Sequence, residues 1–79
     1  MKNFAWVGQC PVCGQGRQVI ARENDTGKMY VVCEECESEW QNPEDAQAKK
    51  PASRDLFGRS TYLTREEIAS HPWEEFLAK

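Results

Sequence analysis

Apolar residues in the first half of the chain gather in short, β-rich runs. The runs occupy residues 4–8, 17–22 and 28–32. In the first run, Phe4 and Trp6 alternate with smaller residues at the period of a strand. Between the second and third runs, residues 24–27 form an Asn-Asp-Thr-Gly turn cluster, in which Gly27 can adopt a positive φ at little cost. The pattern predicts a strand followed by an antiparallel hairpin within residues 1–40.

Residues 41–50 carry the signals of a short helix. Asn42 is a good N-cap, and Pro43 suits the first helical position. Acidic residues follow at the positive end of the helix, lysines stand at its negative end, and Pro51 stops it. Alanine is the only apolar residue type in the segment. We therefore expect this helix to lie on the surface.

Residues 51–79 read as a linker followed by short aromatic helices that pack on the first half of the chain. Thr64 and Glu67 have the spacing of a capping box, which predicts a turn or two of helix through Ala69. His71 and Pro72 interrupt the pattern, and a last helix is expected over residues 73–78. Its apolar face has i, i+3, i+4 spacing. That face consists of Trp73, Phe76 and Leu77.

Length and composition favour one small domain that needs help to stay folded. The chain has 79 residues, 39% of them hydrophobic, so its core is thin. Domains of this size usually rely on a structural metal or on disulfides. No apolar run approaches the roughly 20 residues of a membrane span. The N-terminus lacks the apolar core of a secretory signal, so we expect a cytoplasmic protein in a reducing compartment.

The cysteines fall in two tight pairs with the spacing of a metal site. The pairs are Cys10 with Cys13 and Cys33 with Cys36, and the chain has no other cysteine. Two intervening residues let one turn aim two thiolates at one ion, and a hairpin can return the second turn to the first. In a reducing compartment we expect one structural Zn²⁺ ion bound by all four. Iron, two disulfides or a redox pair remain alternatives.

These motifs, Cys-Pro-Val-Cys-Gly from Cys10 and Cys-Glu-Glu-Cys from Cys33, resemble the zinc-ribbon (rubredoxin-like) class over about residues 4–40. The resemblance implies a β-hairpin with two CxxC knuckles whose backbone N–H groups donate to thiolate sulfur. Gly14 suits the position after the first knuckle, whereas Glu37 occupies the corresponding position in the second. We therefore expect an unusual backbone conformation or a different geometry there. The predicted fold class is a small α+β protein, a zinc ribbon followed by short C-terminal helices.

Nothing in the sequence indicates catalysis. Four cysteines close a tetrahedral site, whereas catalytic zinc normally keeps one position open. Metal binding removes the cysteines as free nucleophiles, and no Ser–His–Asp or Cys–His set is evident. His71, the only histidine, is expected to have a surface or capping role. We therefore predict a binding protein, not an enzyme.

Charge favours a protein partner. The net charge is −3, and one zinc with four thiolates would bring it to about −5. Acidic residues crowd the second knuckle, where they are either a solvated face or a docking patch for a basic protein. The candidate partner-binding residues are Glu34, Glu35, Glu37, Glu39 and Trp40. In size and charge the chain is similar to small bacterial inhibitor and immunity proteins that block basic nucleases.

A nucleic-acid-binding or transcription-associated ribbon is the alternative, because ribbons often occur there. Arg17, Arg22 and Lys28 would then form a basic strand face on which Tyr30 stacks a base. An accessory module of a larger enzyme assembly is a third hypothesis.

The three tryptophans leave a similar choice between core and interface. Trp6 and Trp40 are expected to cover the ribbon, and Trp73 to pin the last helix. The alternative is that one of them is an exposed interface anchor.

Overall fold

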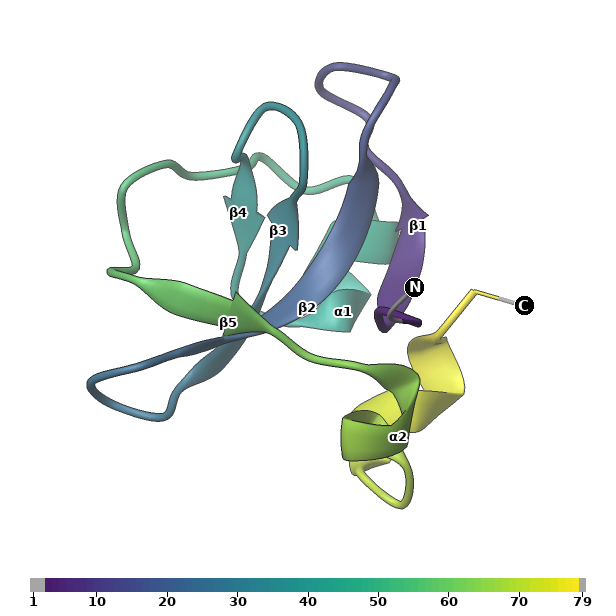
Figure 1. Ribbon diagram of the computed structural model, residues 1–79. Helices are drawn as coiled ribbons and strands as arrows, with labels where there is room; N and C mark the ends of the chain where they lie inside the picture. The colour runs from purple at the N-terminus through teal and green to yellow at the C-terminus, as the bar shows by residue number, and fades with distance from the viewer. Residues whose placement is uncertain (1–2, 79) are drawn as a thin grey trace.

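The computed structural model describes residues 3–78, which form a small α+β fold around one antiparallel sheet (Figure 1). The elements in chain order are β1 (Trp6–Gln9), β2 (Arg17–Glu23), β3 (Met29–Cys33), β4 (Glu39–Trp40), α1 (Pro43–Gln47), β5 (Ser60–Tyr62), α2 (Arg65–Ile68) and the 3-10 helix η1 (Pro72–Phe76).

The predicted hairpin is confirmed as the centre of the sheet. Strands β2 and β3 pair antiparallel from Gln18 opposite Cys33 to Arg22 opposite Met29. Gly27 closes the turn with a φ of 76°, the left-handed conformation that favours glycine. β1 pairs with the outer edge of β2, and β4 with the outer edge of β3, so the order is β1-β2-β3-β4.

A further strand, β5, lies in a region that the sequence indicated to be linker and helix. It pairs with residues 21–23 of β2, on the edge that β1 occupies at residues 17–19, so β1 and β5 lie end to end. They meet at Ile20, which donates to the Ala5 carbonyl at 2.8 Å and accepts from Leu63 N–H at 2.9 Å. Ser60-Thr61-Tyr62 carries too few apolar residues to indicate a strand by periodicity.

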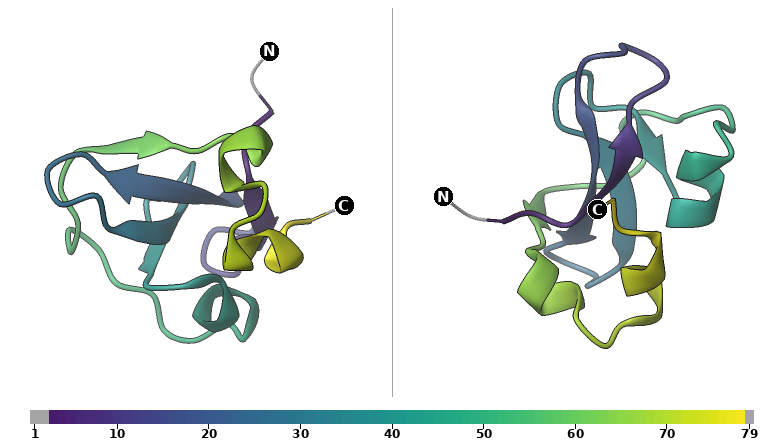
Figure 2. Two further views of the ribbon diagram at one scale, coloured as in Figure 1. Left: turned by 90° about the horizontal axis from the view of Figure 1, so that it is seen from below. Right: turned by 90° about the vertical axis from the view of Figure 1, so that its right-hand side faces the viewer.

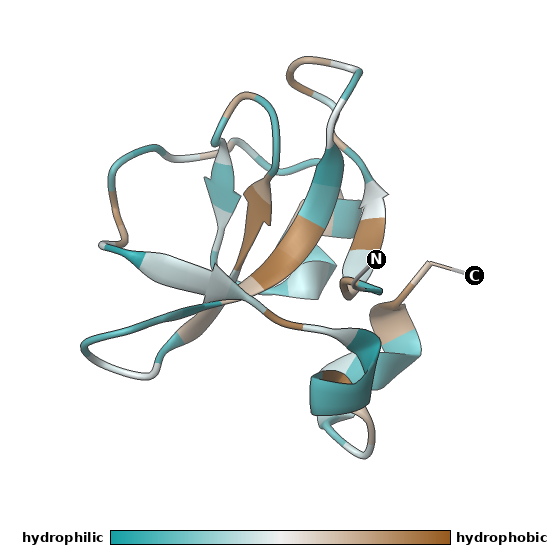
Figure 3. Ribbon diagram, in the orientation of Figure 1, coloured by the Kyte–Doolittle hydropathy of each residue, from teal (hydrophilic) through white to brown (hydrophobic). Residues whose placement is uncertain are grey.

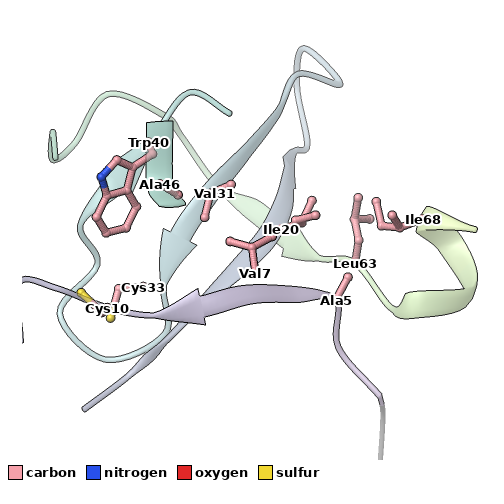
Figure 4. Close-up of a cluster of buried hydrophobic side chains, with 10 residues drawn as sticks. All are labelled: Ala5, Val7, Cys10, Ile20, Val31, Cys33, Trp40, Ala46, Leu63 and Ile68. Carbon is pink, nitrogen blue, oxygen red and sulfur yellow. The ribbon is translucent and has the colours of Figure 1, made fainter. Parts of the chain in front are cut away.

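One face of the sheet carries the larger core, which includes residues from both halves of the chain (Figure 4). Ile20 and Val31 point into it from the central strands, and Leu63 and Ile68 join from the C-terminal segment. The full set of buried members is Ala5, Val7, Cys10, Ile20, Val31, Cys33, Trp40, Ala46, Leu63 and Ile68. Figure 3 shows the hydrophobic centres of β1, β2 and β3 beside one another. The C-terminal segment is therefore part of the same core as the hairpin.

The first helix has one exposed and one buried face, with Glu44 and Gln47 open to solvent. α1 packs against the sheet, with Pro43 and Ala46 buried, and the Gln18 side-chain amide donates to the Ala46 carbonyl at 3.1 Å. Figure 2 shows α1 and β5 on opposite sides of the central strands β2 and β3. Small alanine side chains allow the helix backbone to approach the strands closely. The helix also ends earlier than predicted, at Gln47, although Asn42 caps it as expected.

The C-terminal caps follow the sequence, but the last helix does not. Thr64 and Glu67 form the predicted capping box of α2. His71 Nδ1 accepts from Trp73 N–H at 3.0 Å, which confirms its capping role. The last helix was expected over residues 73–78, but it is a 3-10 helix over Pro72–Phe76. It ends at Phe76 because the backbone of Leu77 is extended. The three predicted apolar residues of this segment are partly buried against the core.

The opposite face of the sheet holds a second, smaller cluster. Ala21, Tyr30 and Val32 are buried there, with Phe57 and Tyr62 packed against them.

Trp6 is half-buried, and the Arg17 guanidinium lies 5.7 Å from the centroid of its ring.

Trp40 belongs to the larger core. It is 2% exposed, and its indole N–H donates to the Lys50 carbonyl at 2.9 Å.

Candidate metal centre

The sheet brings the two cysteine turns together at one end. Cys10 and Cys13 belong to the β1–β2 connection, Cys33 ends β3, and Cys36 lies in the β3–β4 turn. Because Gln18 pairs with Cys33, the start of β2 and the end of β3 are neighbours. Figure 1 shows both connections at the same end of the sheet. The hairpin register therefore determines the position of the cysteine cluster.

The four sulfur atoms have the spacing that a tetrahedral metal ion requires. All lie within 4.8 Å of one another. The Cys10–Cys36 and Cys13–Cys33 sulfur pairs are both 3.7 Å apart. Metal–sulfur bonds of about 2.3 Å give tetrahedral sulfur–sulfur edges of about 3.8 Å. Figure 4 shows the buried pair, Cys10 and Cys33, with their sulfurs adjacent at the edge of the core. The cluster can hold one metal ion.

Backbone amides surround the sulfurs with hydrogen-bond donors. Val12 N–H donates to Cys10 Sγ at 3.3 Å, and Gly16 N–H donates to Cys13 Sγ at 3.5 Å. In the second knuckle, the N–H groups of Glu35 and Cys36 both donate to Cys33 Sγ at 3.4 Å. These donors favour the thiolate form, the form that binds metal.

The surroundings of each cysteine shift its thiol pKa in different directions. The hydrogen bond with Ser38 lowers the pKa of Cys36 to about 6, and the Gly16 N–H lowers the pKa of Cys13. Burial raises the pKa of Cys33 to about 12. Without a cation Cys33 therefore keeps its proton at neutral pH, and metal binding must release that proton. A cation at the cluster would stabilise this buried thiolate.

The two knuckles share one backbone conformation, despite the different residues at their ends. Gly14 has a φ of 70° and Glu37 a φ of 63°. Each donates its N–H to the carbonyl of the first cysteine of its knuckle, at 3.0 Å to Cys10 and 3.2 Å to Cys33. Of the two expectations for Glu37, the unusual backbone conformation is the one that occurs.

Replacing Glu37 by glycine is therefore expected to stabilise the protein. The left-handed conformation costs a non-glycine residue about 1–2 kcal/mol, and the greater flexibility of glycine in the unfolded chain cancels about half of the gain. We expect Glu37→Gly to raise the free energy of unfolding by about 0.5–1 kcal/mol. Urea denaturation of the metal-loaded protein measures this, with Glu35→Gly as the control. A loss of stability at position 37 would contradict the argument.

Three residues were not assigned to this site from the sequence. Ser38 is buried, and its hydroxyl lies 3.2 Å from Cys36 Sγ. A Cβ atom at Gly16 would lie 2.6 Å from Cys33 Sγ, so only glycine fits there. Arg17 holds the second knuckle through its ion pair with Glu34. The Gly-x-Gly sequence after Cys13 was a usable signal for the second glycine, whereas Ser38 and Arg17 carry no signal beyond their position.

The candidate partner-binding residues do not form one exposed patch. Glu34 accepts from the Arg17 guanidinium at 2.8 and 3.2 Å and from its backbone N–H at 3.0 Å, and this ion pair lowers the pKa of Glu34. Glu39 is 6% exposed and accepts from Leu56 N–H at 2.9 Å. Trp40 is buried as described above. Glu35 and Glu37 remain as the exposed carboxylates of the segment, and their role in docking stays a prediction.

The residues of the nucleic-acid-binding alternative also do not share one basic strand face. Arg17 and Arg22 are five residues apart on β2 and project from opposite faces. Tyr30 is 4% exposed and stacks on Phe57 with ring centroids 4.0 Å apart, so its ring already has a partner.

Comparison with known proteins identifies no relative. No family model matches the chain, and no match was found among curated proteins or solved structures. Among the helices of residues 3–78, none has the length and apolar character needed to span a bilayer.

Proposed function

We propose that this protein is a non-catalytic zinc ribbon that acts by binding a basic protein, in the manner of an inhibitor or immunity protein. The observation that carries the proposal is the complete set of four cysteine sulfurs within 4.8 Å. Four protein sulfurs fill a tetrahedral zinc site and leave no position for water or substrate. The metal then has a structural role, and the surface around it is available for recognition.

Zinc is the metal we propose, because a closed site of four cysteines is its usual structural environment. Iron would give a redox centre, which needs an electron-transfer partner surface. A loaded zinc centre carries two negative charges, and the exposed Glu35 and Glu37 stand beside it. This local field favours a basic protein and disfavours phosphate groups.

Charge reversal at the second knuckle tests the function. Tagged, zinc-loaded protein is incubated with a lysate of the source cells, and retained proteins are identified by mass spectrometry. We expect basic proteins to be retained by the wild type and lost with Glu35→Lys/Glu37→Lys. The control Asp25→Lys/Glu75→Lys makes the same change of net charge at exposed positions outside the knuckles and should retain them.

Two outcomes would count against the proposal. Equal retention by all three proteins would exclude a specific acidic contact. Retention that nuclease treatment abolishes would favour the nucleic-acid alternative instead.

A further inference from the structure

A groove of about 750 Å³ lies on the sheet face opposite the larger core. Tyr30 and Val32 of β3 contribute to its lining, and so do residues 57–62, which lead into and form β5. Its remaining boundary comes from Phe4, from Cys36 and Glu37 of the second cysteine knuckle, and from Glu39, Arg54 and Asp55. In Figure 1 the connection from α1 to β5 passes on the left of β4 before it enters β5. The groove is large enough to receive a side chain of another molecule.

Aromatic rings provide part of the lining. Phe4 and Tyr62 are partly buried and meet edge to face, with centroids 5.5 Å apart. Tyr30 and Phe57 form a second, stacked pair. The ammonium group of Lys28 lies 5.6 Å from the Phe57 centroid, so one cation of this chain already lies against an aromatic residue of the groove. The π-faces of such rings attract ammonium and guanidinium groups.

The side-chain charges around the groove nearly balance, and the metal centre decides their sum. Glu37, Glu39 and Asp55 line it, opposed by the exposed guanidinium groups of Arg54 and Arg59. Cys36 also lines it, and a loaded zinc centre there would add two negative charges. With the centre loaded, the three carboxylates and the metal centre outweigh Arg54, Arg59 and the nearby Lys28.

Two tyrosine hydroxyls of the groove lie close enough to these carboxylates to be affected by them. Burial is the main cause that raises the pKa of Tyr30, and the negative charges of Glu39, Glu23 and Glu37 raise it further. Burial likewise raises the pKa of Tyr62, with added contributions from Glu34 and Glu37. A negative field that disfavours a tyrosinate favours a bound cation in the same place.

We propose that this groove receives a lysine or arginine side chain of the partner protein, held between the Phe4–Tyr62 pair and the Glu37 carboxylate. This inference rests on the proposed function, and it places the contact with the basic partner in the groove. Arginine is the better fit, because a planar guanidinium can stack on a ring while it pairs with a carboxylate.

An NMR titration of the zinc-loaded, full-length protein tests this inference. The probes are three capped tripeptides, Gly-Arg-Gly, Gly-Lys-Gly and Gly-Glu-Gly. We expect the arginine and lysine peptides to shift the ring resonances of Phe4 and Tyr62 saturably, the arginine peptide at lower concentration. Glu37→Gln should weaken their binding about two- to fivefold, as expected for one partly exposed ion pair. Glu74→Gln, an exposed change on η1, should leave it unchanged.

The inference would be overturned if the glutamate peptide shifted the same rings equally. Non-saturable shifts over the whole surface, or equal binding by the Glu37 and Glu74 variants, would also overturn it. If the groove fails while basic proteins are still captured through Glu35 and Glu37, the proposed function stands and another surface serves it. If the peptides bind the groove but no basic protein is captured, the groove is a cation site and the proposed function fails.

Discussion

Removing the metal with a strong chelator is expected to unfold the protein. Apparent binding free energies of structural zinc in small peptides reach about 10–16 kcal/mol at neutral pH. Whole domains have a net stability of only about 5–15 kcal/mol, so loss of the metal can remove the entire net stability of the fold. The four cysteines connect β1, β2, β3 and β4, and Cys10 and Cys33 are also members of the larger core. We therefore expect unfolding to begin in residues 1–40 and to include the C-terminal segment.

Near-ultraviolet circular dichroism measures this loss, because Trp40 is buried in the same core. Cys33→Ser should reproduce the effect of the chelator, since it removes a fully buried ligand at the end of β3. Val12→Ala is the matched control. Val12 is 56% exposed at the tip of the first knuckle, and its backbone N–H still donates to Cys10 Sγ in the variant. A metal-free protein that kept its near-ultraviolet spectrum would contradict a structural role for the metal.

Gly16→Ala is expected to have the second-largest effect. Its Cβ atom would lie 2.6 Å from Cys33 Sγ and 2.8 Å from Glu35 Cγ, whereas carbon atoms in contact prefer about 3.5–4.0 Å. Relief requires one knuckle to move away from the other, which separates the metal ligands. We expect a loss of about 3 kcal/mol in stability, the upper range for overpacking. We also expect metal affinity to fall at least tenfold.

Gly14→Ala separates this clash from a loss of backbone freedom. A Cβ atom at Gly14 meets nothing within 4 Å, but its φ of 70° is strained for alanine. The expected net cost is about 0.5–1 kcal/mol, because alanine also restricts the unfolded chain, with a smaller change in metal affinity. Thermal unfolding and a competition titration for zinc measure both quantities. Wild-type affinity in Gly16→Ala would show that the two knuckles are not in close contact.

The elements that the sequence predicted have strong local signals. The hairpin follows from β-rich runs on both sides of a turn ending in Gly27, and the capping box at Thr64 follows from side chains three residues apart. The cysteine cluster follows from spacing alone, because each pair lies in one tight turn. In these cases the interacting residues are close in sequence or are connected by a regular hairpin.

The elements that the sequence missed depend on contacts between distant segments. β5 forms by pairing with β2, and Leu63 N–H donates to the Ile20 carbonyl across 43 positions of the chain, which no local pattern indicates. One face of α1 is buried on the sheet, where the Ala46 carbonyl accepts a hydrogen bond from the Gln18 side chain, a contact that no local pattern indicates. The same limitation applies to the acidic knuckle. A run of glutamates reads as one patch, but Glu34 pairs with Arg17 and Glu39 turns toward Leu56.

X-ray absorption at the metal edge of the purified, loaded protein tests the central claim most directly. The element is identified by its edge, and the first coordination shell gives the number and type of ligands. We predict zinc, one ion per chain, with four sulfur neighbours at about 2.3 Å and no nitrogen or oxygen. A nitrogen or oxygen ligand, or fewer than four sulfurs, would show that the site is open. That result would contradict both the closed four-cysteine centre and the non-catalytic role proposed from it.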